Sequence, residues 1–246
     1  MSDIIEGRNP VIEALKADRE IEKVLIAKGA DSGSVKKIIA MTKEKGIPIQ
    51  YVEKPLLDKQ SETNAHQGVM AYISAYKYSE LEDIVFKAQG KKEDLFVIIL
   101  EGIEDPYNLG AIIRSAEAAG AHGIIIPKRR AVGLTASAVK ASAGAVEYMP
   151  VVRVSNIVQT VQKLKELGVW IAAAHMDGEE YNKANLTGKI ALVIGSEGKG
   201  ISKLLLENCD FAIKMPMKGK IESLNASAAA AVMMYEVVRQ RSAERV

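Results

Sequence analysis

The chain has very little of the chemistry that builds disulfides and metal sites. Its 246 residues include one cysteine, Cys209, which excludes an intrachain disulfide and a cysteine metal cluster. Three scattered histidines argue against a histidine zinc site. No apolar run approaches the roughly 20 residues that span a bilayer, and the N-terminal MSDIIEGRNP lacks the apolar region of a secretion signal. We therefore expect a cytoplasmic protein with no metal and no membrane partner.

Neither sign of charge dominates the composition. The chain has 33 Lys and Arg against 31 Asp and Glu, a formal net charge of +2, so it is not a polycation. A nucleic-acid partner is allowed, but its site would have to be a local basic patch. Hydrophobic residues make up 48% of the chain. A sizeable core is therefore available, in one large domain or two smaller ones.

The first 75 residues form a small α/β pattern of their own. Strand-like segments lie at 23–27, 48–52 and 68–73, and helices are predicted near Pro10 and over 33–45. Residues 76–94 are polar, and we predict a linker with one possible short helix there. The alternation indicates a separate domain over residues 1–75.

Residues 95–246 repeat a stronger β/α rhythm. Helices are predicted at 109–119, 157–167, 201–208 and from Ser223 to about Arg241. Alternation of this kind implies a mostly parallel sheet covered on both faces, with ligands bound at the carboxyl ends of its strands. The strands, read as continuous apolar runs, are predicted at 95–100, 123–127, 169–174, 190–195 and 211–216.

Three strand-to-helix loops carry polar side chains. In EGIEDPYNLGAIIRSAEAAG, Asn108 and Arg114 suit either a cap and an ion pair or a phosphate site. IGSEGKGIS has glycines for close backbone approach, but neither the dinucleotide nor the P-loop spacing, and its Glu197 suits a hydroxyl or a cation. MPMKGKIESLN places Ser223 and Asn225 before a helix. Together the three loops predict one composite site.

These loops, in this order, resemble motifs 1, 2 and 3 of the SpoU (TrmH-like) branch of the SPOUT methyltransferase superfamily. The segments IIEGRNPVIEAL and HQGVMAYI resemble the substrate-binding domain of that branch, which is similar to the ribosomal protein L30e family. The resemblance implies an L30e-like domain over residues 1–75 and a SPOUT domain over residues 95–246, with a deep trefoil knot. It also implies S-adenosyl-L-methionine as cofactor, a homodimer formed through the C-terminal helix, and methylation of a guanosine 2′-hydroxyl in large-subunit (23S) ribosomal RNA.

The resemblance also nominates site residues. An arginine stays protonated in proteins, so Arg114 is an awkward general base. Either it stabilises the developing alkoxide or holds a phosphate, or it orients an RNA phosphate that takes the proton. Glu197 bonds a ribose hydroxyl or an arginine, or merely structures its loop. The implied catalytic residues are Asn108, Arg114, Glu197, Ser223 and Asn225. The expected cofactor-binding residues are Gly195, Met215 and Leu224, mainly through backbone contacts, with Ile194 and Met217 as apolar walls for the adenine.

RNA contacts are expected in two places. The densest basic cluster, KRR at 128–130, either contacts phosphates or is a solvated loop. The other positions follow from the resemblance alone, and His66 equally suits a capped turn. The predicted RNA-binding residues are Arg8, Asn9, His66, Gln67, Lys128, Arg129 and Arg130.

Three rival functions remain at this stage. A catalytically silent RNA-binding protein of the same fold is disfavoured by the joint presence of the five nominated catalytic residues. A small-molecule α/β enzyme is disfavoured by the separate N-terminal domain and the basic cluster. A transfer-RNA methyltransferase is the stronger rival, although transfer-RNA enzymes of this branch commonly lack such an N-terminal domain.

Overall fold

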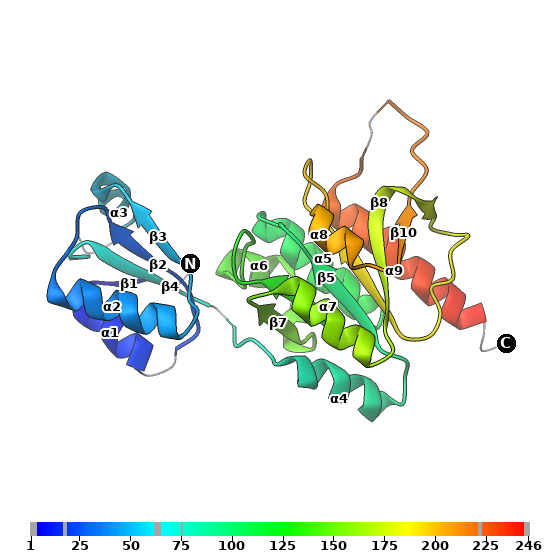
Figure 1. Ribbon diagram of the computed structural model, residues 1–246, viewed down its shortest axis with the longest axis horizontal. Coiled ribbons are helices and arrows are strands. Elements are labelled where there is room, and N and C mark those ends of the chain that lie inside the picture. Colours follow the sequence, from blue (N-terminus) through cyan, green and yellow to red (C-terminus); the bar gives the residue numbers. More distant parts are fainter. Residues whose placement is uncertain (1–3, 17–18, 62–64, 75, 221–222, 244–246) are drawn as a thin grey trace. The chain divides into compact units, whose positions relative to one another are not determined.

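The computed structural model describes residues 4–16, 19–61, 65–74, 76–220 and 223–243 (Figure 1). The chain divides into two compact units, residues 1–77 with 133–136, and residues 78–132 with 137–246. Each unit has its own sheet. The two units are therefore described separately.

The N-terminal unit is a small mixed sheet with helices on both faces. Its strand order is β1-β4-β2-β3, with β2 and β3 parallel and the other pairs antiparallel. The central strand alternates in side-chain direction: Val24 and Ile26 pack with α1 and α2, while Leu25 packs with Leu57 of α3. The elements are β1 (Ile4–Glu6), α1 (Arg8–Lys16), β2 (Ile21–Ala27), α2 (Gly33–Glu44), β3 (Ile49–Val52), α3 (Lys54–Gln60) and β4 (Val69–Ile73).

The C-terminal unit contains a six-stranded sheet in the order β10-β8-β9-β5-β6-β7, and every pair in it is parallel. The predicted α/β class with a mostly parallel sheet is confirmed. Its elements are α4 (Leu81–Lys91), β5 (Phe96–Leu100), α5 (Pro106–Ala118), β6 (Gly123–Pro127), α6 (Ala136–Ala141), a 3₁₀ turn (Ala145–Glu147), β7 (Val151–Val154), α7 (Ile157–Glu166), β8 (Trp170–Glu180), β9 (Ile190–Ile194), α8 (Lys203–Glu207), β10 (Phe211–Lys214) and α9 (Ala226–Ala243).

Helices cover both faces of this sheet (Figure 1). Val97 and Ile99 share a core with α4, α7 and α8. Helices α5 and α9 pack against each other, and α9 also lies against β9. Because both faces are covered, all five residues of β5 and all five of β9 are buried. Such strands read in the sequence as continuous apolar runs, which is why they were predictable.

Several elements differ from the sequence-based expectation. The polar segment 76–94 contains the three-turn helix α4, which passes through Gly90 and buries Ile84 and Ala88. Strand β7 was not predicted, because it has only four residues and one of them is an arginine. Strand β8 runs beyond 174 because β10 pairs with it again at 179–180 after a register shift. Gly178 permits that approach: a Cβ there would lie 2.4 Å from the carbonyl carbon of Ala212.

The amino edge of the large sheet, where its strands begin, holds polar side chains whose hydrogen-bond partners are other groups of the protein. His122 is fully buried. Its Nδ1 accepts the Phe96 amide (3.0 Å), and its Nε2 pairs with the Glu93 carboxylate at 3.2 Å. Burial, opposed by Glu93, holds the pKa of His122 below its ordinary value. The ring is therefore a neutral structural bridge between two strands.

Arg241, near the end of α9, ties that helix to the same edge. Its guanidinium donates to the carbonyl oxygens of Asp94 (3.2 Å), Leu95 (3.4 Å) and Gly188 (2.6 Å). It also lies over the Phe96 ring, 5.2 Å from the centroid. An arginine with so many protein partners is part of the scaffold.

The single cysteine belongs to this edge as well. The Cys209 thiol donates to the Leu205 carbonyl oxygen at 3.3 Å. Burial, reinforced by the nearby Asp210 carboxylate, raises the pKa of Cys209 to about 11. The thiolate is the reactive form of cysteine, so this side chain is chemically quiet in the folded protein.

Candidate active site

The carboxyl edge of the large sheet, where its strands end, brings the predicted loops together. The segments after β5 and β9 start from adjacent strands. Glu101 joins them: its amide donates to the Ile194 carbonyl (2.9 Å), and its carboxylate accepts from the Ser202 amide (2.7 Å) and hydroxyl (2.8 Å). Ser202 in turn caps α8. One carboxylate therefore fixes two loops and a helix start.

The glycines of the second loop allow a tight closed turn. Ser196 and Gly200 exchange backbone hydrogen bonds of 3.2 and 2.9 Å. Gly200 has a positive φ of 64°, and a Cβ on Gly195 would lie 2.2 Å from the Gly200 carbonyl carbon. The closed turn leaves Glu197 and Lys199 at its tip, both exposed.

Asn108, Glu197 and Asn225 form one hydrogen-bonded group, here called the amide–carboxylate cluster. Glu197 Oε1 accepts from Asn108 Nδ2 (3.1 Å) and Asn225 Nδ2 (2.7 Å). Asn225 Nδ2 also donates to Asn108 Oδ1 at 2.8 Å. The three residues come from the three predicted loops, so the composite site expected from the sequence has a physical centre.

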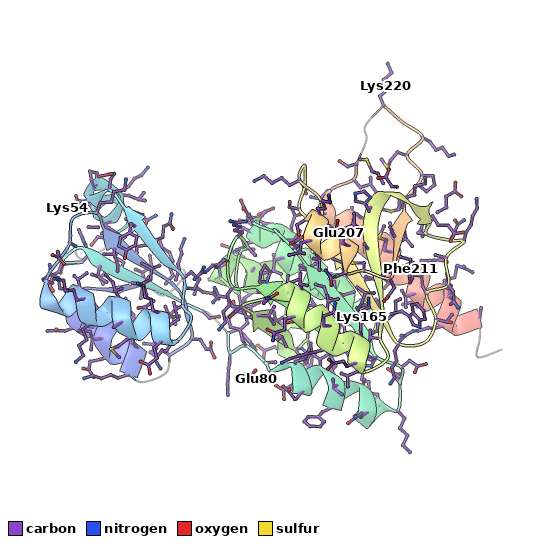
Figure 2. All side chains as sticks on the ribbon, viewed as in Figure 1. Lys54, Glu80, Lys165, Glu207, Phe211 and Lys220 are labelled. Carbon is purple, nitrogen blue, oxygen red and sulfur yellow. The ribbon has the colours of Figure 1, made fainter. Side chains whose placement is uncertain are left out.

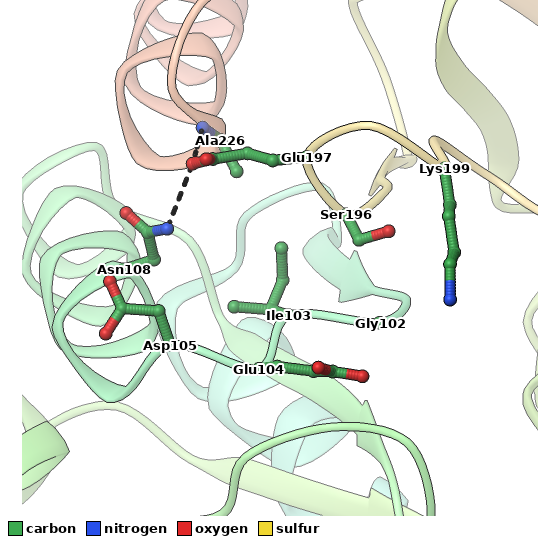
Figure 3. Close-up of a pocket in the computed structure, with 9 residues that line it drawn as sticks. All are labelled: Gly102, Ile103, Glu104, Asp105, Asn108, Ser196, Glu197, Lys199 and Ala226. Atoms are coloured by element: carbon green, nitrogen blue, oxygen red, sulfur yellow. Dashed lines mark hydrogen bonds between the residues drawn. The ribbon is translucent and has the colours of Figure 1, made fainter.

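The start of α9 completes this cluster. The Ala226 amide donates to Glu197 Oε1 at 3.1 Å (Figure 3). Asn225 Oδ1 accepts the amides of Ser227 (3.0 Å) and Ala228 (3.3 Å), so Asn225 also serves as the helix cap. The Glu197 carboxylate therefore lies at the positive end of a helix, where a negative charge is stabilised. In this structure the Glu197 carboxylate bonds residues of the other two loops.

A pocket of about 190 Å³ opens beside the cluster (Figure 3). Sequence reasoning missed most of its lining, because loop shape rather than periodicity brings these residues together. The only signal was their position next to motif residues. The lining comprises Gly102, Ile103, Glu104, Asp105 and Asn108 from the first loop and α5, Ser196, Glu197 and Lys199 from the second, and Ala226.

Two of the nominated catalytic residues lie outside the cluster. Arg114 is exposed and makes no hydrogen bond or ion pair with the described part of the chain. Six residues after Asn108, it lies about 120° around α5 from it. Ser223 is exposed in the segment before α9, and no hydrogen bond of its side chain occurs among the described residues. Both side chains are therefore available to a ligand.

The residues nominated for the cofactor follow two different strands. Ile194 ends β9 and is buried, and Gly195 begins the closed turn. Met215 and Met217 follow β10 in a segment that runs outward to Lys220 (Figure 2), and Leu224 precedes α9. Met217 and Leu224 are 37% and 42% exposed. They are apolar side chains left open beside the site.

The basic cluster follows β6, a third strand. Lys128 is half-buried, and its carbonyl accepts from Arg153 at 3.3 Å, whereas Arg129 and Arg130 are exposed. Arg130 has a positive φ of 57°, so the loop turns sharply there. The two exposed guanidinium groups are free to meet an anionic partner.

The nominated residues of the N-terminal unit lie at the start of α1 and in the turn before β4. His66 is 3% exposed, with Nε2 on the Asp58 carboxylate (2.8 Å) and Nδ1 accepting the Gly68 amide (3.0 Å). These bonds favour the capped-turn alternative for His66. Gln67, with φ of 49°, is exposed, and its carbonyl accepts from Arg8 Nε at 2.9 Å. Asn9 is exposed at the start of α1.

The described residues contain no group of three or more His, Cys, Asp or Glu side chains placed to hold a metal ion. Among the described helices, none combines the length and the apolar character that a membrane crossing requires. The arrangement is that of an α/β protein whose ligand site lies at the carboxyl edge of a parallel sheet.

Family models match both units. Residues 95–235 match the SpoU rRNA Methylase family, and residues 4–79 match the RNA 2′-O ribose methyltransferase substrate-binding domain. The first match covers more than half of the chain. The chain therefore belongs to the SpoU rRNA methylase family and is an RNA methyltransferase of the TrmH/SpoU type, as its motifs predicted.

Individual relatives agree with this assignment. The Bacillus subtilis protein YacO, described as belonging to the TrmH family of tRNA/rRNA methyltransferases, is 50% identical over 98% of this chain and 96% of its own. An AdoMet-bound rRNA methyltransferase from Sinorhizobium meliloti has a TM-score of 0.60 at 26% identity, covering 97% of this chain and 87% of that one. The SpoU methyltransferase AviRb of Streptomyces viridochromogenes, also solved with AdoMet, has a TM-score of 0.62 at 24% identity, covering 98% and 90%.

Proposed function

We propose that this protein transfers a methyl group from S-adenosyl-L-methionine to the 2′-hydroxyl of a guanosine in large-subunit ribosomal RNA. The observation that carries the proposal is the amide–carboxylate cluster, built from all three motif loops beside an open pocket. A catalytically silent relative would have no need to keep this cluster together with the unpartnered Arg114.

The residues after β9 and β10 fit the cofactor. Gly195 begins the closed turn, where a Cβ would meet the Gly200 carbonyl carbon at 2.2 Å, and the backbone of this turn is the proposed cofactor contact. Met217 and Leu224 offer exposed apolar surface for the adenine ring. Ile194 and Met215 complete the proposed wall. When bound, the cofactor supplies a methyl group activated by its positively charged sulfur.

During attack, the 2′-hydroxyl must lose its proton, and the negative charge that develops on its oxygen must be stabilised. Both tasks fall to residues of the chain or to the RNA itself. Arg114 is protonated at any working pH and takes no proton. It either stabilises the negative charge that develops on the 2′-oxygen or orients an RNA phosphate that accepts the proton. Asn108 and Asn225 hold the loops in register, and Ser223 offers a hydroxyl near the cofactor segment.

Ribosomal RNA is favoured over transfer RNA by the two-domain organisation. The rRNA methyltransferase of Sinorhizobium meliloti covers 97% of this chain, including the N-terminal unit. In this proposal Arg8, Asn9 and Gln67 contact RNA, His66 supports their turn, and Lys128, Arg129 and Arg130 bind phosphates. The target RNA is cytoplasmic, which sets the proposed location of the enzyme.

We also infer a homodimer formed through α9. Ala228, Val232 and Tyr235 recur at helical spacing on one face, and Val232 and Tyr235 are 40% and 51% exposed. A Val232→Glu and Tyr235→Glu double variant should sediment as a monomer. A Lys203→Glu variant on α8 should remain dimeric, and a double variant that stays dimeric would locate the interface elsewhere.

The deep trefoil knot implied by the family resemblance is part of the same proposal. Strand β10 comes after β9 in the chain but pairs with β8 at the edge of the sheet. Helix α9 then returns to pack on α5 and β9. This doubling back is the kind of path that a knot requires.

The first experiment is methyl transfer from labelled S-adenosyl-L-methionine to unmodified large-subunit rRNA and, separately, to unmodified tRNA. We expect label on a ribose 2′-oxygen of rRNA alone, and nuclease mapping would then identify the nucleotide. Label on tRNA alone would keep the chemistry and overturn the substrate. Absence of cofactor binding would overturn the enzyme proposal itself.

A further inference from the structure

The pocket beside the cluster takes most of its lining from the loop after β5 and the start of α5, which carry none of the proposed cofactor residues. The loop after β9 contributes to both: Ile194 and Gly195 come directly before Ser196, Glu197 and Lys199 of the pocket lining. The pocket therefore adjoins the proposed cofactor residues from the β5 side of the sheet. The pocket is therefore placed to receive the substrate.

Two opposite charges in this pocket have no partner. Glu104 and Lys199 both line it, and both are exposed. Neither forms an ion pair or hydrogen bond with the other or with any other described residue. The remaining acids of the pocket differ: Asp105 accepts the Tyr107 amide at 3.0 Å to cap α5, and Glu197 is held in the cluster. Glu104 is thus the pocket carboxylate with both oxygens free.

We propose that Glu104 reads the base of the target nucleotide and selects guanine, an inference that rests on the RNA 2′-O-methylation proposed above. Guanine carries two adjacent donors on its Watson–Crick edge, the N1–H and the 2-amino group. A carboxylate accepts from both at once. Adenine and cytosine present a bare ring nitrogen there, which faces the carboxylate with a lone pair.

Lys199 provides the contrast within the same pocket. An ammonium group only donates hydrogen bonds and suits the RNA backbone phosphates. Such a contact is the same for every base. Loss of Lys199 should therefore weaken all substrates equally, whereas loss of Glu104 should weaken discrimination between bases.

The test compares guanosine with inosine at the methylated position of an rRNA fragment. Inosine keeps the N1–H and lacks only the 2-amino group. For the wild-type protein we expect kcat/KM to fall at least about tenfold on this replacement, because one charge-assisted hydrogen bond is lost. In Glu104→Ala the ratio of guanosine to inosine should fall to about one. Glu104 has no partner among the residues that the structure describes, so this variant should fold normally.

Two control variants make the result specific. Lys199→Ala should lower kcat/KM for both fragments and leave their ratio unchanged. Glu166→Ala, an exposed acid at the end of α7, should change neither. An unchanged ratio in Glu104→Ala would overturn the role of Glu104.

The two proposals fail in different ways. If the wild-type protein methylates a ribose whose base is not guanine, the inference about Glu104 is wrong and the methyltransferase proposal stands. If the wild-type protein transfers no methyl group to any RNA, the proposed function is wrong, and the inference falls with it.

Discussion

The two edges of the large parallel sheet both hold polar side chains bonded within the protein, but they differ in the charged side chains left without a partner. At the amino edge, His122 bonds the Phe96 amide and the Glu93 carboxylate, and Arg241 donates to three backbone carbonyl groups. At the carboxyl edge, Glu104 is exposed and has no partner among the described residues, and the same holds for Arg114, more than two turns into α5. Polar side chains that are hydrogen-bonded within the protein stabilise the fold, and charged side chains without such a partner are available to a ligand. In the proposed function, the first group is structural and the second acts on the substrate.

The largest effects on turnover and on stability are expected from two arginine variants, one on α5 and one near the amino edge. Arg114→Ala should lower methyl transfer by about 10²–10³-fold, the usual cost of losing a charge stabiliser in an active site. Its melting temperature and dimer should be unchanged, because Arg114 has no partner in the described part of the chain. Steady-state kinetics and calorimetry on the same preparation would measure both.

Arg241→Ala is the matched arginine variant, at the amino edge. It should lower the free energy of unfolding by about 1–3 kcal/mol, because three carbonyl groups lose a charged donor. Turnover per folded molecule should be retained. If Arg114→Ala lowered the melting temperature and retained turnover, Arg114 would be a structural residue and would have no role in methyl transfer.

Glu197→Ala is expected to have the next largest effect, because Glu197 combines both kinds of role. Asn108, Asn225 and the Ala226 amide would lose a shared acceptor. Water can reach this exposed site, so the loss of stability should be only about 1–2 kcal/mol. Turnover should fall by about 10²-fold as the three loops lose their register. Glu197→Gln, which keeps an acceptor oxygen, should recover part of the activity; no recovery would indicate that the negative charge itself is required.

Removal of the basic cluster should have a moderate effect. Lys128, Arg129 and Arg130 changed together to alanine should weaken RNA binding and reduce the slope of log affinity against log salt by about 2, as expected for three phosphate contacts on single-stranded RNA. Lys163→Ala with Lys203→Ala, on α7 and α8, is the control of similar charge. Equal slopes for the two variants would assign the cluster to a solvated loop.

The smallest effect on turnover is expected from His122. Its pKa is lowered in the folded protein, so the unfolded chain binds the proton more readily. This contribution to stability is complete above the ordinary pKa near 6.5 and is lost as the pH falls below it. His122→Gln cannot take up this proton, so its unfolding free energy should depend less on pH between 7 and 5. Denaturant titrations at several pH values would measure this, and identical pH dependence in both proteins would contradict it.

The sequence predicted the parts of the fold that have a strong periodic signal. Strands β5 and β9 are apolar throughout because helices cover both faces of the sheet. Strand β1 was missed, since three residues paired to β4 are too short to carry a pattern. Helix α4 was expected only as a possible short helix within a linker, because its exposed face is polar, although Ile84 and Ala88 are buried.

The site was predictable only where motif residues carry it. The motif loops supplied Asn108, Glu197 and Asn225, and the geometry brings these three together. Glu104 and Lys199 could not be predicted, because their shared pocket depends on how two loops close. Arg114 was nominated by resemblance, and its separation from the cluster follows from helical geometry rather than from spacing in the sequence.

The residues of the amide–carboxylate cluster are far apart in the sequence. Their order in the chain sets the order in which the parts of the candidate active site are synthesised. Asn108 and Glu197 are 89 residues apart, and Asn225 lies 28 residues further on, directly before the final helix. A chain emerging from the ribosome folds its N-terminal parts first. The substrate-binding unit and two of the three loops therefore exist before the residue that locks them together. In the proposed function, the nascent protein binds RNA before its active site is complete, and the last segment to be synthesised completes that site.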